Sequence, residues 1–144
     1  YNSNHEVLGS DTFRRIFRVC LADNGTEFSN PRAIEYDSMG NLRTRIFYCD
    51  PSAPHQKGSA ERNHEFIRCF IPKGKSFNSL SQSDVTRMMN HINSYHRESL
   101  GNQPPYDMFS FLYDEDILKR LGCVKIPAAE VTLNSSIFNK GGQL

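Results

Sequence analysis

The first half of the chain contains two short apolar runs of the kind found in β-strands. Residues 17–22 form a compact β-favouring run, which predicts a strand buried on both faces, as in a parallel sheet. Residues 42–49 alternate between polar and apolar and then become apolar, which predicts a second strand. Between them, Asn30 followed by Pro31 predicts a helix start, because proline is favoured at the first helical position. Chain breakers over 37–41 predict a turn.

The residues before the first strand are mostly polar. Residues 1–7 are expected to be loosely structured. Ser10 or Asp11 is a suitable N-cap for a short helix over 12–16. Together with the strands, this helix predicts a mixed α/β fold.

Helical periodicity dominates the second half of the chain. A helix is expected over 59–71, with Glu61 outside its apolar stripe. That stripe consists of Ala60, Ile67, Phe70 and Ile71, with Phe66 beside it. Ser81 and Asp84 resemble a capping box and predict a helix from Val85 to about His96. Its buried face is expected to contain Val85, Met88, Met89, Ile92 and Tyr95.

Shorter elements are expected towards the C-terminus. The pattern predicts helices at 106–113 and 116–121 and a strand at 130–133. His91 and His96 have no carboxylate or thiol neighbours suited to a metal site, so a structural role is expected for both.

Composition limits the classes of protein that remain. A chain of 144 residues with a mean hydropathy of −0.58 has room for one ordinary domain and contains no candidate membrane span or secretory signal. Its net charge of +1 neither favours nor excludes nucleic acid. The four cysteines are far apart in sequence and lack zinc-ligand spacing, so we expect reduced core thiols in a cytoplasmic protein. The first residue is Tyr1 rather than Met, which suggests a fragment.

Two carboxylates lie next to predicted structural boundaries. Asp23 follows the first strand, and Glu61 lies near the start of the 59–71 helix. Asp23-Asn24-Gly25 is also a strong hairpin signal, but the residues after it favour a loop and a helix rather than a returning strand. The tips of strands are where open α/β sheets build their sites. Carboxylates on rigid elements are the ligands that hard divalent cations require.

The local motifs resemble the catalytic core of bacterial DDE transposases and retroviral-type integrases, in particular the insertion-sequence family numbered thirty. The matching segments are Asp23 to Phe28, Phe47 to Pro51, Gln56 to Asn63 and Pro72 to Gly74. His91 to Tyr95 with Arg97, and Pro105-Tyr106 with Phe109, extend the resemblance over roughly residues 8 to 125. Many motifs in the right order are far more specific than any one of them.

The resemblance implies a ribonuclease-H-like (integrase catalytic core) fold in which Asp23 and Glu61 are the second Asp and the Glu of the catalytic triad. The first Asp has no counterpart before Asp23, because Asp11 lies at a predicted helix start, where capping explains it. The chain is therefore expected to lack the first strands of the sheet and to be inactive alone. Residues 1–112 would be the C-terminal part of the core, followed by a helical and extended tail at 113–144.

The resemblance also implies a cofactor and partners. Two Mg²⁺ or Mn²⁺ ions would be held in the intact enzyme, which would cut DNA at the transposon ends and join the freed 3′-hydroxyl to target DNA. Phosphate contacts are expected from basic residues beside the site. These are Lys57, Arg62, Arg68, Lys73 and Lys75. A homo-oligomer is expected, formed through the unpaired sheet edge, with a bacterial cytoplasmic location at the nucleoid when DNA is bound.

Two other interpretations remain open. The chain would be a non-catalytic module that binds DNA or another transposase subunit, which the missing first Asp favours. Alternatively, it is an α/β domain in which Asp23-Asn24-Gly25 forms only a turn and the basic residues belong to an ordinary solvated surface.

Overall fold

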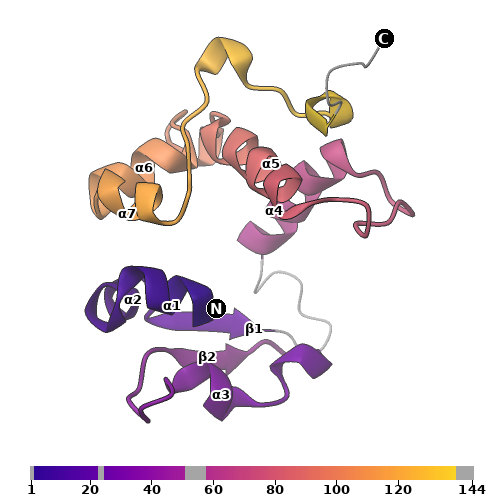
Figure 1. Ribbon diagram of the computed structural model, residues 1–144. Coiled ribbons are helices and arrows are strands. Elements are labelled where there is room, and N and C mark those ends of the chain that lie inside the picture. The colour runs from indigo at the N-terminus through magenta and orange to yellow at the C-terminus, as the bar shows by residue number, and fades with distance from the viewer. Residues whose placement is uncertain (1, 23–24, 51–57, 139–144) are drawn as a thin grey trace. The chain divides into compact units, whose positions relative to one another are not determined.

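The structure is a computed structural model that describes residues 2–22, 25–50 and 58–138. The chain divides into two compact units, residues 1–61 and 62–144, and each is described by itself. The described residues contain seven α-helices and one two-stranded parallel sheet (Figure 1). The predicted mixed α/β class is confirmed.

The first unit begins with two short helices. α1 spans Asn2–Leu8 and α2 spans Ser10–Ile16, and Gly9 joins them with a φ of 76°, a left-handed value that favours glycine. Phe13 is fully buried, and the His5 ring meets it edge-on with ring centroids 5.2 Å apart. The expectation that residues 1–7 are loose was wrong for residues 2–7, because packing against Phe13 compensates for weak helix signals; Tyr1 lies outside the described residues. Gly9, rather than Ser10 or Asp11, is the N-cap of α2.

The two predicted strands pair in parallel. β1 (Val19–Ala22) and β2 (Arg45–Tyr48) lie side by side, with Cys20 opposite Ile46 (Figure 1). A 3-10 turn (η1, Thr26–Phe28) and helix α3 (Pro31–Glu35) connect them. The side chain of Asn30 caps α3 by accepting a hydrogen bond from the Ala33 amide, as the Asn-Pro signal predicts.

One face of this sheet is apolar and exposed. Val19, Leu21 and Phe47 are each more than half exposed. They occupy alternate positions on the strands, and Leu21 lies opposite Phe47 in the register. The prediction that the first strand is buried on both faces was wrong for the described residues, because no helical layer covers the face that carries Val19 and Leu21.

A buried arginine ties α3 to β2. Arg43 is 5% exposed and donates hydrogen bonds to the carbonyl oxygens of Ile34 (2.9 Å) and Ala33 (2.8 Å) at the end of α3. Glu35 accepts a hydrogen bond from the Ile46 amide of β2. The predicted turn at 37–41 forms between them, with the Asp37 carboxylate accepting from the Asn41 amide.

The second unit is built on two amphipathic helices. α4 spans Gly58–Phe70 and α5 spans Gln82–Ser94. Their apolar faces supply one core cluster, which consists of Phe70, Ile71, Met88 and Ile92. The predicted capping box of Ser81 and Asp84 is present with both reciprocal hydrogen bonds. Tyr95 was wrongly placed on the buried face, because α5 ends before it and its side chain is 40% exposed.

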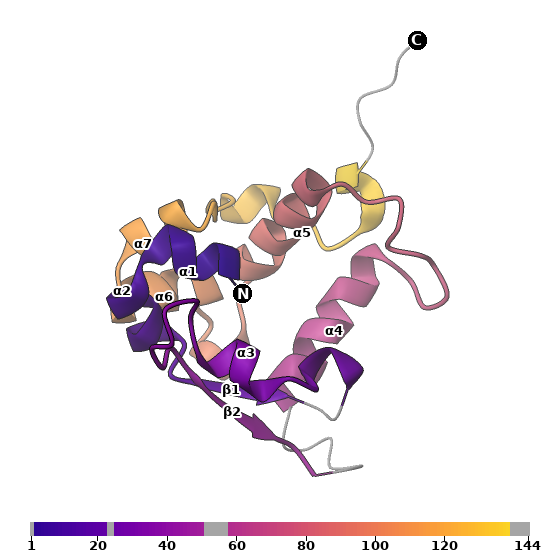
Figure 2. The same ribbon diagram turned by 60° about the horizontal axis from the view of Figure 1, so that its bottom comes forward.

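The C-terminal part contains helices but no strand in the described residues. α6 (Pro105–Leu112) and α7 (Glu115–Arg120) form as predicted, after the 3-10 turn η3 (Glu98–Leu100). The predicted strand at 130–133 is replaced by the 3-10 turn η4 (Ala128–Glu130) and irregular chain. The last described turn, η5 (Ser135–Phe138), lies beside α5 (Figure 2).

Polar side chains of α5 hold this tail. The amides of Val124, Ile126 and Thr132 donate hydrogen bonds to Asn90 Oδ1 (3.1 Å), Ser94 Oγ (2.9 Å) and His91 Nδ1 (3.1 Å). All three acceptor residues are buried. This explains why residues 130–133 form no strand: the Thr132 amide bonds to a side chain rather than to a neighbouring strand. The structural role expected for His91 is confirmed.

The four cysteines are free thiols, as predicted. Cys49 is buried, whereas Cys20 and Cys123 are partly buried. Cys69 is exposed, so the expectation that all four are core residues was wrong at this position.

Candidate functional site

The first turn of α4 presents Glu61 to solvent. The side chain is exposed and has no hydrogen bond or ion pair with another described residue. An acidic residue in a first helical turn also interacts favourably with the helix dipole. Among the described residues, neither packing nor pairing engages the Glu61 carboxylate, which leaves it available to bind a cation.

Two turns of α4 are held in place by Arg97. Its Nη2 donates a hydrogen bond to Asn63 Oδ1 at 3.1 Å. Its guanidinium lies over the Phe66 ring, with Cζ 4.7 Å from the ring centroid. Burial, and secondarily the positive charge of Arg62, lower the pKa of Arg97. Its Nε is buried with no hydrogen-bond partner among the described residues. Arg97 therefore braces the helix two residues after Glu61, a contact that the sequence motif did not reveal.

Arg62 is the first of the predicted DNA-contacting residues on α4. Its guanidinium forms an ion pair with Glu65 at 3.3 Å, and both side chains are about two-thirds exposed. An exposed pair of this kind contributes little to stability. The Arg62 side chain also lines a cavity of about 380 Å³ with Phe66, Tyr95 and Arg97.

Three of the predicted DNA-contacting residues line one cleft at the end of α4. Arg68 lies on the last turn of the helix, and Lys73 and Lys75 lie on the loop that follows. The cleft has a volume of about 440 Å³. We call it the α4–loop cleft; its lining residues are His64, Ile67, Arg68, Ile71, Pro72, Lys73, Gly74, Lys75 and Phe77.

Asp23 and Lys57 lie outside the described residues. β1 ends at Ala22, so the sequence position of Asp23 directly follows the strand. The predicted meeting of Asp23 with Glu61 therefore stays a prediction. Within the described part of the chain, no group of three or more histidine, cysteine, aspartate or glutamate side chains is arranged to hold a metal ion.

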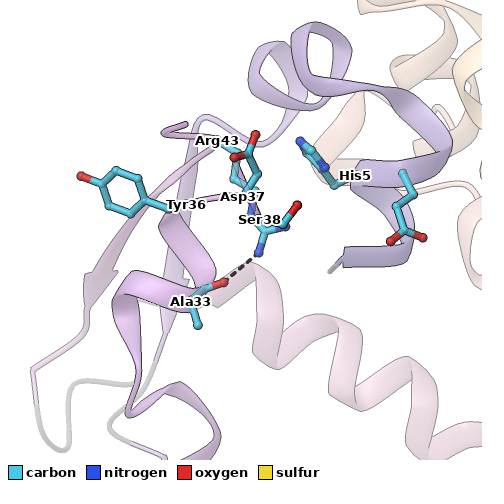
Figure 3. A pocket seen from close by; sticks show the side chains of 7 residues that line it. His5, Ala33, Tyr36, Asp37, Ser38 and Arg43 are labelled. Atoms are coloured by element: carbon cyan, nitrogen blue, oxygen red, sulfur yellow. Dashed lines mark hydrogen bonds between the residues drawn. The ribbon is translucent and has the colours of Figure 1, made fainter. Parts of the chain in front are cut away.

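A second polar cavity lies within the first unit, with a volume of about 340 Å³. Figure 3 shows Asp37, Arg43 and His5 around it. The Asp37 carboxylate accepts hydrogen bonds from the turn that it closes, chiefly from the Asn41 amide, and these hydrogen bonds lower its pKa. Arg43 is committed to the carbonyl oxygens of α3. Asp37 and Arg43 therefore both serve the fold of the first unit.

None of the helices in the described part of the chain is both long and apolar enough to cross a membrane.

Comparison with known proteins identifies transposases and an integrase. The chain is 26% identical over 103 residues to a transposase for insertion sequence element IS4351 from Bacteroides fragilis, covering 72% of this chain and 30% of the relative. It is 32% identical over 89 residues to a putative integrase from Spiroplasma virus SpV1-R8A2 B, covering 62% and 26%. It is 27% identical over 66 residues to a transposase for IS1086 from Cupriavidus metallidurans, covering 46% and 20%.

The chain thus spans less than a third of the length of these curated relatives. No protein-family model matches the chain. No solved structure matches it either. The resemblance to insertion-sequence transposases and integrases that the motifs indicate is confirmed by the relatives.

Proposed function

We propose that this chain, a relative of insertion-sequence transposases and integrases, is the part of a DNA transposase that carries two of its three catalytic carboxylates. Its intact protein would act in DNA transposition or integration. The observation that carries the proposal is Glu61, which is exposed and unpaired among the described residues on the first turn of α4. The relatives supply the class of reaction.

The proposed fold is part of a ribonuclease-H-like core. Support comes from the parallel pairing of β1 with β2 and from the helical connection between the two strands. Parallel strands align their carboxyl ends at the same end of a sheet, and a residue that directly follows β1 in the sequence is expected there. The exposed apolar face of Val19, Leu21 and Phe47 fits a larger sheet.

The proposed metal ligands are Asp23 and Glu61. Carboxylate oxygens suit Mg²⁺ and Mn²⁺. When bound, such ions supply activation of an attacking oxygen and stabilisation of a leaving oxygen. Asn63 and Arg97 would act as positioning residues, because their hydrogen bond steadies the helix that carries Glu61. The basic residues Lys57, Arg62, Arg68, Lys73 and Lys75 would bind DNA phosphates.

Calorimetric titration with Mn²⁺ tests the metal site. We expect a binding heat for the wild-type chain that is lost in Glu61→Gln and in Asp23→Asn. Glu65→Gln is the matched control, since Glu65 lies one turn further along α4, is also exposed and pairs with Arg62. Equal isotherms for wild type and Glu61→Gln would contradict the site.

The chain alone is proposed to be inactive in DNA cleavage. Two carboxylates without a third protein ligand bind Mg²⁺ weakly. Measurable Mg²⁺-dependent nicking of DNA by residues 1–144, abolished by Glu61→Gln, would overturn this statement while supporting the catalytic role of Glu61.

A homo-oligomer is proposed through the sheet. Leu21 and Phe47 form part of an exposed apolar face, and surfaces of this kind commonly mark association sites. Sedimentation velocity of the wild type should show concentration-dependent association that Leu21→Asp reduces. A monodisperse monomer at all concentrations would contradict the proposal.

The alternative is a non-catalytic module that binds DNA or another transposase subunit. The basic α4–loop cleft favours DNA as its partner. DNA binding that persists in Glu61→Gln without any metal-binding heat in the wild type would favour this alternative.

A further inference from the structure

The α4–loop cleft gathers three basic side chains, and its two lysines differ from the other described lysines in having no ion pair with a described residue. Arg68, Lys73 and Lys75 have no ion pair with another described residue, and no acidic side chain lines the cleft. The other two described lysines are paired: Lys119 Nζ lies 3.0 Å from Glu115, and Lys125 Nζ lies 2.7 Å from Asp107. The cleft therefore presents uncompensated positive charge, which attracts an anionic ligand.

The same cleft also has an apolar side. Ile67, Ile71 and Pro72 contribute to its lining, together with Phe77, whose side chain is 55% exposed. A turn closed by the Lys75 amide on the Pro72 carbonyl (3.1 Å) leads the chain from α4 back to the cleft. Gly74 has a φ of 88° in this turn, a left-handed value that favours glycine. A ligand that contacts the cleft through phosphates alone would make no contact with the Phe77 ring or the aliphatic lining.

A nucleotide with an unpaired base can contact both the basic side chains and the apolar lining of the cleft. An exposed aromatic ring offers a stacking surface to any base, and basic side chains around it follow the phosphates. The volume of about 440 Å³ lies in the range of ordinary ligand pockets, roughly 300–1,000 Å³. In a continuous duplex the base faces are stacked inside the helix, so Phe77 has no base to contact there.

We propose that the α4–loop cleft binds an unpaired nucleotide of a DNA strand, with its base against Phe77 and its neighbouring phosphates on Arg68, Lys73 and Lys75. The proposal rests on the proposed function in that DNA is the partner. Its site is separate from the metal carboxylates, because Arg68 lies seven residues after Glu61, about 10 Å along α4. Binding at the cleft needs neither a metal ion nor an intact catalytic triad.

The test is a fluorescence titration of the whole chain in EDTA. The probe is a single-stranded oligonucleotide that contains one 2-aminopurine, whose emission is quenched when the base stacks. We expect wild-type binding to quench the probe. Phe77→Ala should weaken single-strand binding about tenfold and abolish the quenching, while duplex affinity changes less than twofold. Phe77→Tyr, which keeps the ring, should retain the quenching.

Matched controls separate stacking from charge and from misfolding. Phe111→Ala removes an 86% exposed phenyl ring from α6 and should leave binding and quenching unchanged. The double variant Lys73→Gln, Lys75→Gln should weaken binding more than Lys125→Gln, because Lys125 is already paired with Asp107. An abasic oligonucleotide should bind wild type and Phe77→Ala equally.

Three results would overturn the proposal. The first is that the single strand binds without quenching the probe and that Phe77→Ala does not change its affinity, which would indicate backbone contacts alone. The second is an acidic peptide that binds more tightly than the oligonucleotide and loses affinity in Phe77→Ala, which would indicate a protein partner. The third is no DNA binding in EDTA. Because the titration contains no free metal, none of these results depends on whether Glu61 holds a cation.

Discussion

The two units of the chain close off their apolar surface to very different extents. In residues 62–144, amphipathic helices α4 and α5 bury Phe70, Met88 and Ile92 against each other. In residues 1–61, the helices enclose Phe13, but the two-stranded sheet leaves Leu21 and Phe47 more than half exposed. Helices that are close in sequence can complete a small core by themselves, whereas a sheet face needs a further layer packed against it.

The largest expected effect tests this contrast directly. Ile92→Ala removes a fully buried side chain and should lower the free energy of unfolding by about 3–4 kcal/mol. Leu21→Ala, a change of the same size on the exposed sheet face, should cost less than about 1 kcal/mol. Urea unfolding monitored by far-UV circular dichroism measures both variants.

A larger loss of stability than expected in Leu21→Ala would also be informative. A cost close to that of Ile92→Ala would mean that the sheet face is covered in solution. The same measurement at two protein concentrations would then identify self-association as the cause, because the stability of an associated state depends on concentration.

A smaller loss of stability is expected when the buried Arg43 of the first unit is replaced. Arg43→Ala removes two hydrogen bonds to the carbonyl oxygens at the end of α3 and should cost about 2–3 kcal/mol. Arg45→Ala is the control, since Arg45 is exposed on β2 and should cost less than about 0.5 kcal/mol. Equal costs for the two variants would show that the α3–β2 connection does not depend on Arg43.

Sequence reasoning succeeded where local signals and local packing agree. The presence of α4 and α5, the Ser81–Asp84 capping box and the parallel pairing of the strands follow from hydrophobic periodicity and cap chemistry. Residues 2–7 and 130–133 were misread because their conformation depends on side-chain contacts that the hydrophobic pattern does not show. α1 depends on Phe13, and the Thr132 amide bonds to His91 across the unit.

The candidate site shows the same division. Motif and spacing pointed to Glu61 and to Arg68, Lys73 and Lys75, and the structure places Glu61 on α4 and the three cations around one cleft. Their roles stay predictions. Arg97 was not found as the partner of Asn63, since 34 residues separate them and a side chain–side chain hydrogen bond leaves no periodic signal. Phe77 was likewise missed, because an isolated aromatic residue in a loop predicts nothing about its exposure.

The capping box gives a smaller and local effect in the second unit. Ser81→Ala removes the acceptor of the Asp84 amide hydrogen bond and should cost about 1 kcal/mol. Ser83→Ala, on the exposed first turn of α5, should change stability by less than about 0.5 kcal/mol. Urea unfolding should separate the two variants, and hydrogen exchange should show faster exchange confined to the start of α5. A uniform increase over residues 62–138 would contradict a local role.

The smallest expected effect is a slope in stability with pH. Burial lowers the pKa of His91 below its ordinary value, and the positive charge of Arg87 lowers it further. The unfolded chain therefore takes up a proton near pH 6.5, while the folded chain stays neutral until a lower pH. The stabilisation is complete above about pH 6.5 and is lost as the pH falls towards the folded pKa. Protonation would also place a second donor against the Thr132 amide, which donates to Nδ1. Hydrogen exchange at Thr132, corrected for the intrinsic pH dependence, should accelerate below about pH 6.5 in the wild type, and His91→Gln should remove that acceleration. An unchanged pH profile in His91→Gln would assign the loss of stability to another titrating group.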